Sequence, residues 1–182
     1  AAVDRGADFD GETSAVFENV TPLESGKPFT VAFWLKVNGK LRDPILEGPG
    51  LSVHLDDFEL SAVQQRTPRL YVPWGDTGIR TAARLPWPDN MNHIVIQSNG
   101  ADIGILVNGH PMPVEPWAPP AARKKEGPLE IASFKGRLDV LRIYDRQLKP
   151  QEIEKLQHEE SLRATLAILP ANLVPTSRKL WP

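Results

Sequence analysis

The sequence predicts an all-β fold, an antiparallel β-sandwich with a short C-terminal helical tail. Short apolar segments of strand length recur along the chain and are separated by turn residues. Eighteen prolines and thirteen glycines favour many turns and short strands over helices. At 182 residues the chain is long enough to bury a core, and one domain is the default expectation.

Residues 136–144 are the candidate for a closing strand of the sandwich. Both faces of this segment are largely apolar, which is typical of a strand buried on most of both sides. Simple alternation would place Leu138, Val140 and Arg142 on one face and Asp139, Leu141 and Ile143 on the other. Pro150 then stands at a first helical position, so a short helix is expected over residues 151–156.

The remaining strands are expected before this segment. The clearest covers residues 29–37, where apolar side chains alternate. The others are expected around Phe9 and over residues 15–17, 44–47, 51–55, 58–63, 91–98, 103–107, 110–114 and 129–132, with turns at Asp10-Gly11, Asn38-Gly39, Asn99-Gly100 and Asn108-Gly109. Proline and glycine interrupt residues 67–84, and the proline-rich residues 111–128 are expected to be an exposed loop. A second helical segment is expected over residues 161–169, where Pro170 stops it.

The run GRLDVLRIYDRQLKPQEIEKL at residues 136–156 resembles the last strand and helix of laminin-G-like domains of bacterial secreted proteins, which have a concanavalin A-like jelly-roll fold. The matching positions are Gly136, Leu138, Asp139, Leu141, Arg142, Ile143, Tyr144, Arg146, Leu148, Glu152 and Ile153. Lys149 stands where the family has a serine N-cap, a change that removes a capping bond of roughly 1 kcal/mol. The resemblance extends over residues 9–156 and implies a laminin-G-like sandwich for residues 1–156. Residues 157–182 are then a helical tail or a linker to a following domain.

The run SLRATLAILPANLVPTSRKLW at residues 161–181 resembles, at Leu162, Leu166, Ala167, Pro170, Thr176 and Leu180, the segment that follows a laminin-G-like insert in large planctomycete and verrucomicrobial exported proteins with cytochrome-like domains. This resemblance implies that the chain is a module of a larger exported bacterial protein, extracellular or periplasmic. The chain begins at Ala1 without a methionine, which we interpret as a mature product or an excised piece.

Composition excludes several kinds of function. The net charge is −2 and the pI about 6.1, so nothing indicates electrostatic attraction to nucleic acid or anionic lipid. The absence of cysteine excludes disulfides and thiolate chemistry within this chain. The sequence has no stretch of about 18 consecutive apolar residues, so no membrane-spanning helix is expected. The family resemblance, and not the composition, implies carbohydrate or neighbouring domains of the parent protein as the partners.

Three tryptophans are candidates for ligand contact. Trp74, Trp87 and Trp117 lie in the proline-flanked contexts VPWGD, LPWPD and EPWAP, which read as loops. Tryptophan faces stack on sugar rings, and Asp76 and Arg80 are polar residues near them in sequence. The alternative is that these tryptophans cap the ends of the sandwich core.

Calcium is the one candidate cofactor, and Asp10 and Asp139 are its candidate ligands by resemblance to related domains. The alternative is that Asp10 forms an Asx-turn and that Asp139 contacts backbone or an arginine. His93 fits the family's hairpin histidine and is expected to be a packed, hydrogen-bonded core residue.

The chain is expected to be non-catalytic. Asp8, Asp10 and Glu12 are spaced as in the catalytic strand of jelly-roll glucanases, but Gly11 favours a turn there. A glycoside hydrolase would need paired carboxylates on a concave strand, and the sequence identifies none. The favoured function is a carbohydrate-binding accessory module, and the alternative is a structural or interaction domain that docks neighbouring domains.

Overall fold

The computed structural model describes residues 7–18, 20, 22–24, 26–37, 44–56, 69–74, 77–82, 91–117, 127–131 and 134–168, without the side chains of residues 56, 74, 77 and 160–168. The chain divides into two compact units, residues 1–148 and residues 149–182. The predicted strand at 58–63 and the predicted turn at Asn38-Gly39 lie outside the described residues. The predicted domain boundary after residue 156 stays a prediction.

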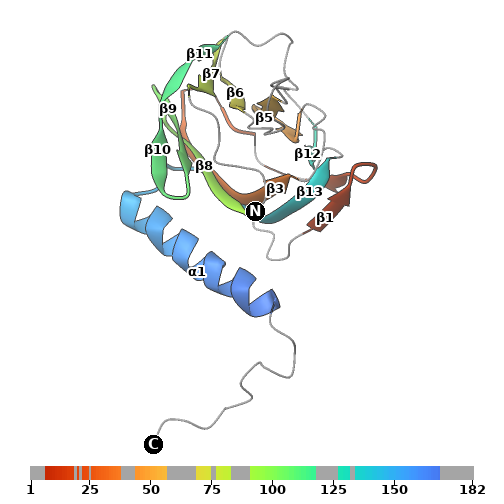
Figure 1. The fold of residues 1–182 in the computed structure, drawn as a ribbon. Helices are drawn as coiled ribbons and strands as arrows, with labels where there is room; N and C mark the ends of the chain where they lie inside the picture. Colours follow the sequence, from red (N-terminus) through yellow and green to blue (C-terminus); the bar gives the residue numbers. More distant parts are fainter. Residues whose placement is uncertain are drawn as a thin grey trace, which may run out of the picture. The chain divides into compact units, whose positions relative to one another are not determined.

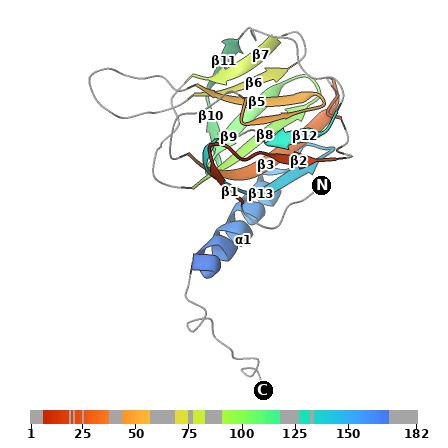
Figure 2. The same ribbon diagram turned by 90° about the vertical axis from the view of Figure 1, so that its right-hand side faces the viewer.

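The first unit is a sandwich of two antiparallel sheets (Figures 1 and 2). One sheet has six strands in the order β1 (Ala7–Asp10), β13 (Lys135–Tyr144), β3 (Pro28–Val37), β8 (Asn92–Asn99), β9 (Ile103–Val107) and β10 (His110–Met112). The other has seven in the order β11 (Val114–Trp117), β7 (Thr77–Thr81), β6 (Arg69–Trp74), β5 (Leu51–Asp56), β4 (Leu46–Gly48), β12 (Leu129–Ile131) and β2 (Ala15–Phe17). Both sheets pair antiparallel throughout the described registers, so the predicted all-β sandwich is confirmed.

The core lies between the two sheets. In β3 the alternating side chains of Phe29, Val31, Phe33 and Leu35 are at most 1% exposed, as the sequence pattern predicts. They belong to one cluster with inward-facing residues of the second sheet, including Val53, Leu55, Leu70 and Val72. Burying each such side chain contributes roughly 1.5–3 kcal/mol.

The alternation predicted for β13 is wrong beyond Asp139. A register shift separates the pairs Asp139–Trp34 and Arg142–Ala32, so Val140 and Leu141 together face a single residue of β3. This is a β-bulge, and Val140 adopts a positive φ of 49° within it. The extra residue turns Leu141 into the core with Leu138, each 3% exposed.

Three strands were not predicted, namely β6, β7 and β11. The first two lie in the segment interrupted by proline and glycine, and β11 lies in the predicted exposed loop. Pro73 follows Tyr71, where the pairing of β6 with β5 ends, so its missing N–H costs no hydrogen bond to β5. Pro116 lies on β11, an edge strand, where a missing N–H is also tolerated. Proline and glycine residues are therefore compatible with strands at β6, β7 and β11.

The second unit contains one continuous helix, α1 (Pro150–Ile168), where two shorter helices were predicted. Its first turn is stabilised although the serine N-cap is missing. The Lys149 N–H donates to the Glu152 carboxylate at 2.8 Å, and the Ile153 N–H donates to the Lys149 carbonyl at 3.1 Å. This is half of a capping box, and Pro150 holds the first helical position as predicted. Within the described part of the chain, no helix is both long and apolar enough to cross a membrane.

Candidate functional site

Two of the predicted ligand-binding residues, Arg80 and Trp117, lie on the same face of the seven-stranded sheet. Arg80 is opposite Glu115 in the register of β7 and β11, and Trp117 follows Glu115 by two residues. Tyr71 of β6 is opposite Arg80 on its other side. Since side chains alternate along a strand, these residues share one face. The neighbouring Leu70 and Val72 are fully buried in the core, so that face is the outer one.

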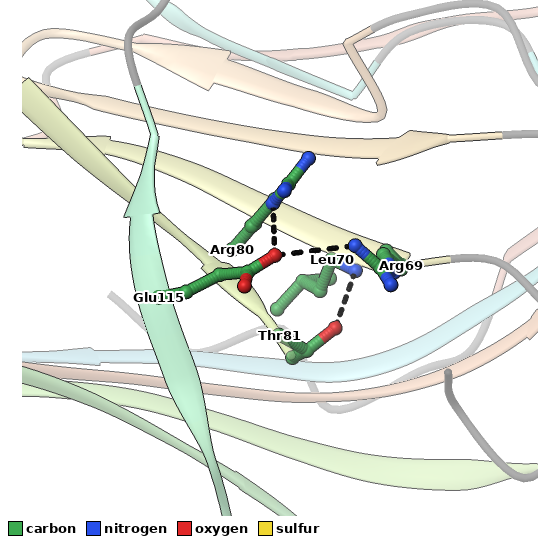
Figure 3. A network of polar contacts seen from close by, with 5 residues as sticks. All are labelled: Arg69, Leu70, Arg80, Thr81 and Glu115. Carbon is green, nitrogen blue, oxygen red and sulfur yellow. Dashed lines mark hydrogen bonds and ion pairs between the residues drawn. The ribbon is translucent and has the colours of Figure 1, made fainter. Parts of the chain in front are cut away.

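The centre of this face is a network of two arginines around one carboxylate (Figure 3). Oε1 of Glu115 accepts from Nε of Arg80 at 2.5 Å and from Nη1 of Arg69 at 3.2 Å. The three side chains are between 31% and 38% exposed, so solvent and ligand can reach them. The hydrogen bond to Glu115 raises the pKa of Arg80 above its ordinary value, with a smaller contribution from Tyr71, so this guanidinium stays charged.

An aromatic group adjoins the network. The Trp117 ring lies edge-on to Tyr71 with ring centroids 4.8 Å apart, and His54 of β5 lies 6.2 Å from it. Trp117 is half-buried, whereas Tyr71 beneath it is 9% exposed. The His54 ring is also within 2.6 Å of the Ser52 hydroxyl. We call Arg69, Tyr71, Arg80, Glu115 and Trp117 the arginine–tryptophan site.

A pair of glutamates occupies the same sheet further along. Glu47 of β4 is directly opposite Glu130 of β12, and Ser52 is opposite Glu47 on the other side. Both glutamates alternate with buried neighbours, so both face outward. Residues opposite each other on antiparallel strands have Cβ atoms about 4.5–5.5 Å apart. The sequence alone did not identify this carboxylate pair.

The structure describes little of the other three predicted ligand-binding residues, Trp74, Asp76 and Trp87. Trp74 ends β6, and its side chain lies outside the described residues. Asp76 and Trp87 lie wholly outside them. Trp74 and Trp117 were both expected in loops, but each is the last residue of a strand.

Asp10, the first candidate calcium ligand, ends β1 and closes a turn. Its Oδ1 accepts hydrogen bonds from the N–H groups of Glu12 and Thr13, both at 2.9 Å, and these bonds lower its pKa to about 2. This is the Asx-turn of the alternative interpretation. Gly11 follows with φ of 98°, so Glu12 lies in a turn and not on a strand with Asp8.

Asp139, the second candidate, contacts an arginine. Nη2 of Arg137 lies 3.3 Å from the Asp139 carboxylate, which is 13% exposed. Asp10 is opposite Lys135, four residues from Asp139 along β13, and this spacing is roughly 13 Å. The described residues contain no cluster of three or more metal-ligating side chains. Calcium binding at Asp10 or Asp139 stays a prediction.

His93 is fully buried, and burial lowers its pKa to about 4. Its backbone N–H donates to the Asn108 side chain at 2.9 Å, and its carbonyl accepts from the Asn108 N–H at 2.8 Å. The ring packs against Trp34 with ring centroids 5.1 Å apart, so the predicted packing of His93 in the core is confirmed, whereas the hydrogen bonds named here are made by its backbone.

A pocket of about 630 Å³ opens elsewhere in the first unit. It lies between the segment before β3 and the end of β13, and Leu23, Phe29, Ile143 and Tyr144 are among the residues that line it. Of the predicted site residues whose side chains the structure describes, none lines this pocket.

Sequence reasoning missed Arg69, Tyr71 and Glu115. A usable signal was present in the run RLYV at residues 69–72, where polar and apolar side chains alternate as in a half-buried strand. Glu115 gives no such local signal, because its importance depends on which strand lies next to β11.

The sheet order and registers define a jelly-roll β-sandwich with an open polar and aromatic face. A laminin-G family model, described as the concanavalin A-like lectin/glucanases superfamily, matches residues 9–154. The chain belongs to this superfamily, so the predicted family is confirmed.

Solved structures show the same fold at low sequence identity. Domain 4 of AbnA, a GH43 extracellular arabinanase from Geobacillus stearothermophilus solved with arabinotriose, is 18% identical with a TM-score of 0.56, covering 86% of this chain and 80% of that one. A SAP-like pentraxin from Limulus polyphemus is 13% identical with a TM-score of 0.58, covering 84% and 81%. A putative carbohydrate binding protein from Bacteroides ovatus is 15% identical with a TM-score of 0.59, covering 82% of this chain and 46% of that one. No curated protein matches the chain by sequence.

Proposed function

We propose that this chain is a non-catalytic carbohydrate-binding module of a larger exported bacterial protein, and that the sugar binds at the arginine–tryptophan site. The observation that carries the proposal is the meeting of Arg80, Glu115 and Trp117 on adjacent strands β7 and β11. The extracellular or periplasmic location and the parent protein follow from the family resemblance and are part of the proposal.

The chemistry of the site suits a saccharide. Guanidinium N–H groups donate to hydroxyl oxygens, and the Glu115 carboxylate accepts from hydroxyl groups. Tryptophan provides a flat apolar face with a polar edge, which matches the C–H face of a sugar ring. The likeness to a domain solved with arabinotriose supports sugars as the first ligand class to test, although one fold hosts many functions.

The test is a glycan array followed by calorimetry with the wild-type protein and two variants, Arg80→Ala and Trp117→Ala. We expect each variant to bind the best glycan at least tenfold more weakly. Arg137→Ala is the matched control, because Arg137 is 39% exposed and also ion-paired, but lies in the other sheet. Trp117→Phe, which keeps an aromatic ring, guards against a misfolded alanine variant.

Two outcomes would contradict the proposal. Equal losses in Arg80→Ala and Arg137→Ala would move the site away from β7 and β11. No glycan binding by the folded wild-type protein would favour a role in docking neighbouring domains. Repeating the array with calcium and with a chelator tests the candidate calcium ligands in the same experiment.

A second candidate function, glycoside hydrolysis, is favoured by the opposed Glu47 and Glu130. Retaining glycosidases use two carboxyl groups about 5–5.5 Å apart. Chromatography of each bound oligosaccharide after long incubation decides between the two. Shortened products that disappear in Glu47→Gln would establish catalysis, and unchanged oligosaccharides support a binding module.

A further inference from the structure

We infer that the saccharide bound at the arginine–tryptophan site carries a carboxylate, so that the ligand class is a uronic-acid-containing oligosaccharide. This inference rests on the proposed function and narrows its ligand.

The first argument is the balance of charge at the site. Among the side chains that the structure describes, two guanidinium groups share one carboxylate, Glu115, so these three groups together carry one net positive charge. Both arginines contact the same oxygen, Oε1. A second carboxylate, supplied by the ligand, would complete a pairing of two arginines with two acids.

The second argument is the geometry of Arg80. This side chain donates to Glu115 through Nε, and in Figure 3 its terminal nitrogens point away from that carboxylate. A carboxylate binds the two parallel N–H groups of a guanidinium edge in bidentate fashion. Arg69 donates to Glu115 through a terminal nitrogen, Nη1, whereas Arg80 donates through Nε, so Arg80 is the arginine we expect to meet the ligand.

The third argument is the distance to the acidic part of the same sheet. Glu47 lies on β4, three strand positions from β7 in the sheet order, which corresponds to roughly 14 Å. Glu130 lies on β12, one strand further. Charges separated by more than about 8 Å are largely screened at physiological salt. The positive charge of the arginines is therefore felt only near β7. We expect an extended ligand to bind with its carboxylate toward that strand.

The fourth argument is the position of Trp117. It follows Glu115 by two residues on one face of β11, a step of about 7 Å. That step is on the scale of one sugar ring. A ring whose carboxylate meets Arg80 can therefore place its apolar face near the tryptophan.

The experiment compares an acidic saccharide with its uncharged methyl ester, which keeps the same sugar backbone. Trigalacturonate and its fully methyl-esterified form are titrated into the wild-type protein by calorimetry, and a neutral arabino-oligosaccharide and a sulfated oligosaccharide are titrated alongside. We expect the acid to bind at least tenfold more tightly than the ester, and this difference to shrink in 300 mM NaCl. Arg80→Gln should abolish the difference, whereas Arg137→Gln should preserve it.

Each remaining outcome has a defined meaning. Equal binding of acid and ester, or tighter binding of the neutral or sulfated saccharide, would overturn the carboxylate and leave carbohydrate binding intact. No binding of any of these saccharides would overturn the carboxylate inference, and a glycan array empty of ligands would overturn the proposed function as well. The comparison of acid with ester uses the wild-type protein, so it stands even where a variant fails to fold.

Discussion

Replacing Gly50 by alanine should strongly destabilise the sandwich. Gly50 lies in the turn between β4 and β5 with φ of 74°. A Cβ built there would lie 1.8 Å from the carbonyl oxygen of Leu23. Leu23 cannot easily retreat, because its N–H donates to the Pro49 carbonyl at 3.0 Å.

The magnitude follows from two separate effects. A positive φ costs a residue with a Cβ roughly 1–2 kcal/mol. Relieving the overlap with Leu23 adds about 1–3 kcal/mol for the displaced backbone and roughly 1 kcal/mol for the hydrogen bond that is lost. The free energy of unfolding should therefore fall by about 3–6 kcal/mol in Gly50→Ala.

Gly26→Ala separates these two effects. Gly26 has a similar φ of 85°, but no atom lies within 4 Å of a Cβ built on it. We expect this variant to lose about 1–2 kcal/mol, the cost of the positive φ alone. Urea denaturation of both variants, followed by circular dichroism, measures the difference. Equal losses would refute the close approach of Gly50 to Leu23.

Three further predictions concern buried and titrating groups. The buried Thr30 hydroxyl donates to the Arg146 carbonyl at 2.9 Å and accepts from the Leu148 N–H at 3.0 Å, so Thr30→Val should lose about 2–3 kcal/mol in urea denaturation while Thr30→Ser loses less. The lowered pKa of Asp10, about 2, means that its stabilising effect is present above pH 4 and is lost as the pH falls toward 2; Asp10→Asn should flatten stability in that window, and an unchanged profile would contradict the Asx-turn. Burial lowers the pKa of His93 to about 4, so the unfolded chain binds the proton more tightly and stability should fall by up to about 3 kcal/mol as the pH drops from 6.5 to 4. His93→Gln should remove that fall, and a titration of His93 by NMR near its ordinary pKa would contradict its burial.

The local pattern of the chain predicted much of the first sheet. In β3, β8 and β9 the apolar residues alternate or form buried runs, and turn pairs such as Asn99-Gly100 separate them. These signals lie within a few residues of each other, so a sequence displays them directly. The bulge at Val140 was not predictable in this way, because it depends on how β13 meets β3.

The second sheet shows where local reasoning stops. Pro73, Gly78 and Pro116 usually break strands, yet β6, β7 and β11 form around them. Each of these residues is accepted because of its neighbours in the sheet. The order of the strands in the sheet could not be predicted from the local sequence pattern.

The sequence by itself determined the all-β class and the family, and it predicted Arg80 and Trp117 as candidate ligand contacts. Only the tertiary structure decided that Arg80 meets Glu115, 35 residues further along the chain, and that Glu47 faces Glu130. Alternation fixes which face of a strand a side chain occupies, because the backbone repeats every two residues. Sheet order and register fix which side chains meet across strands, and these depend on packing over the whole sandwich.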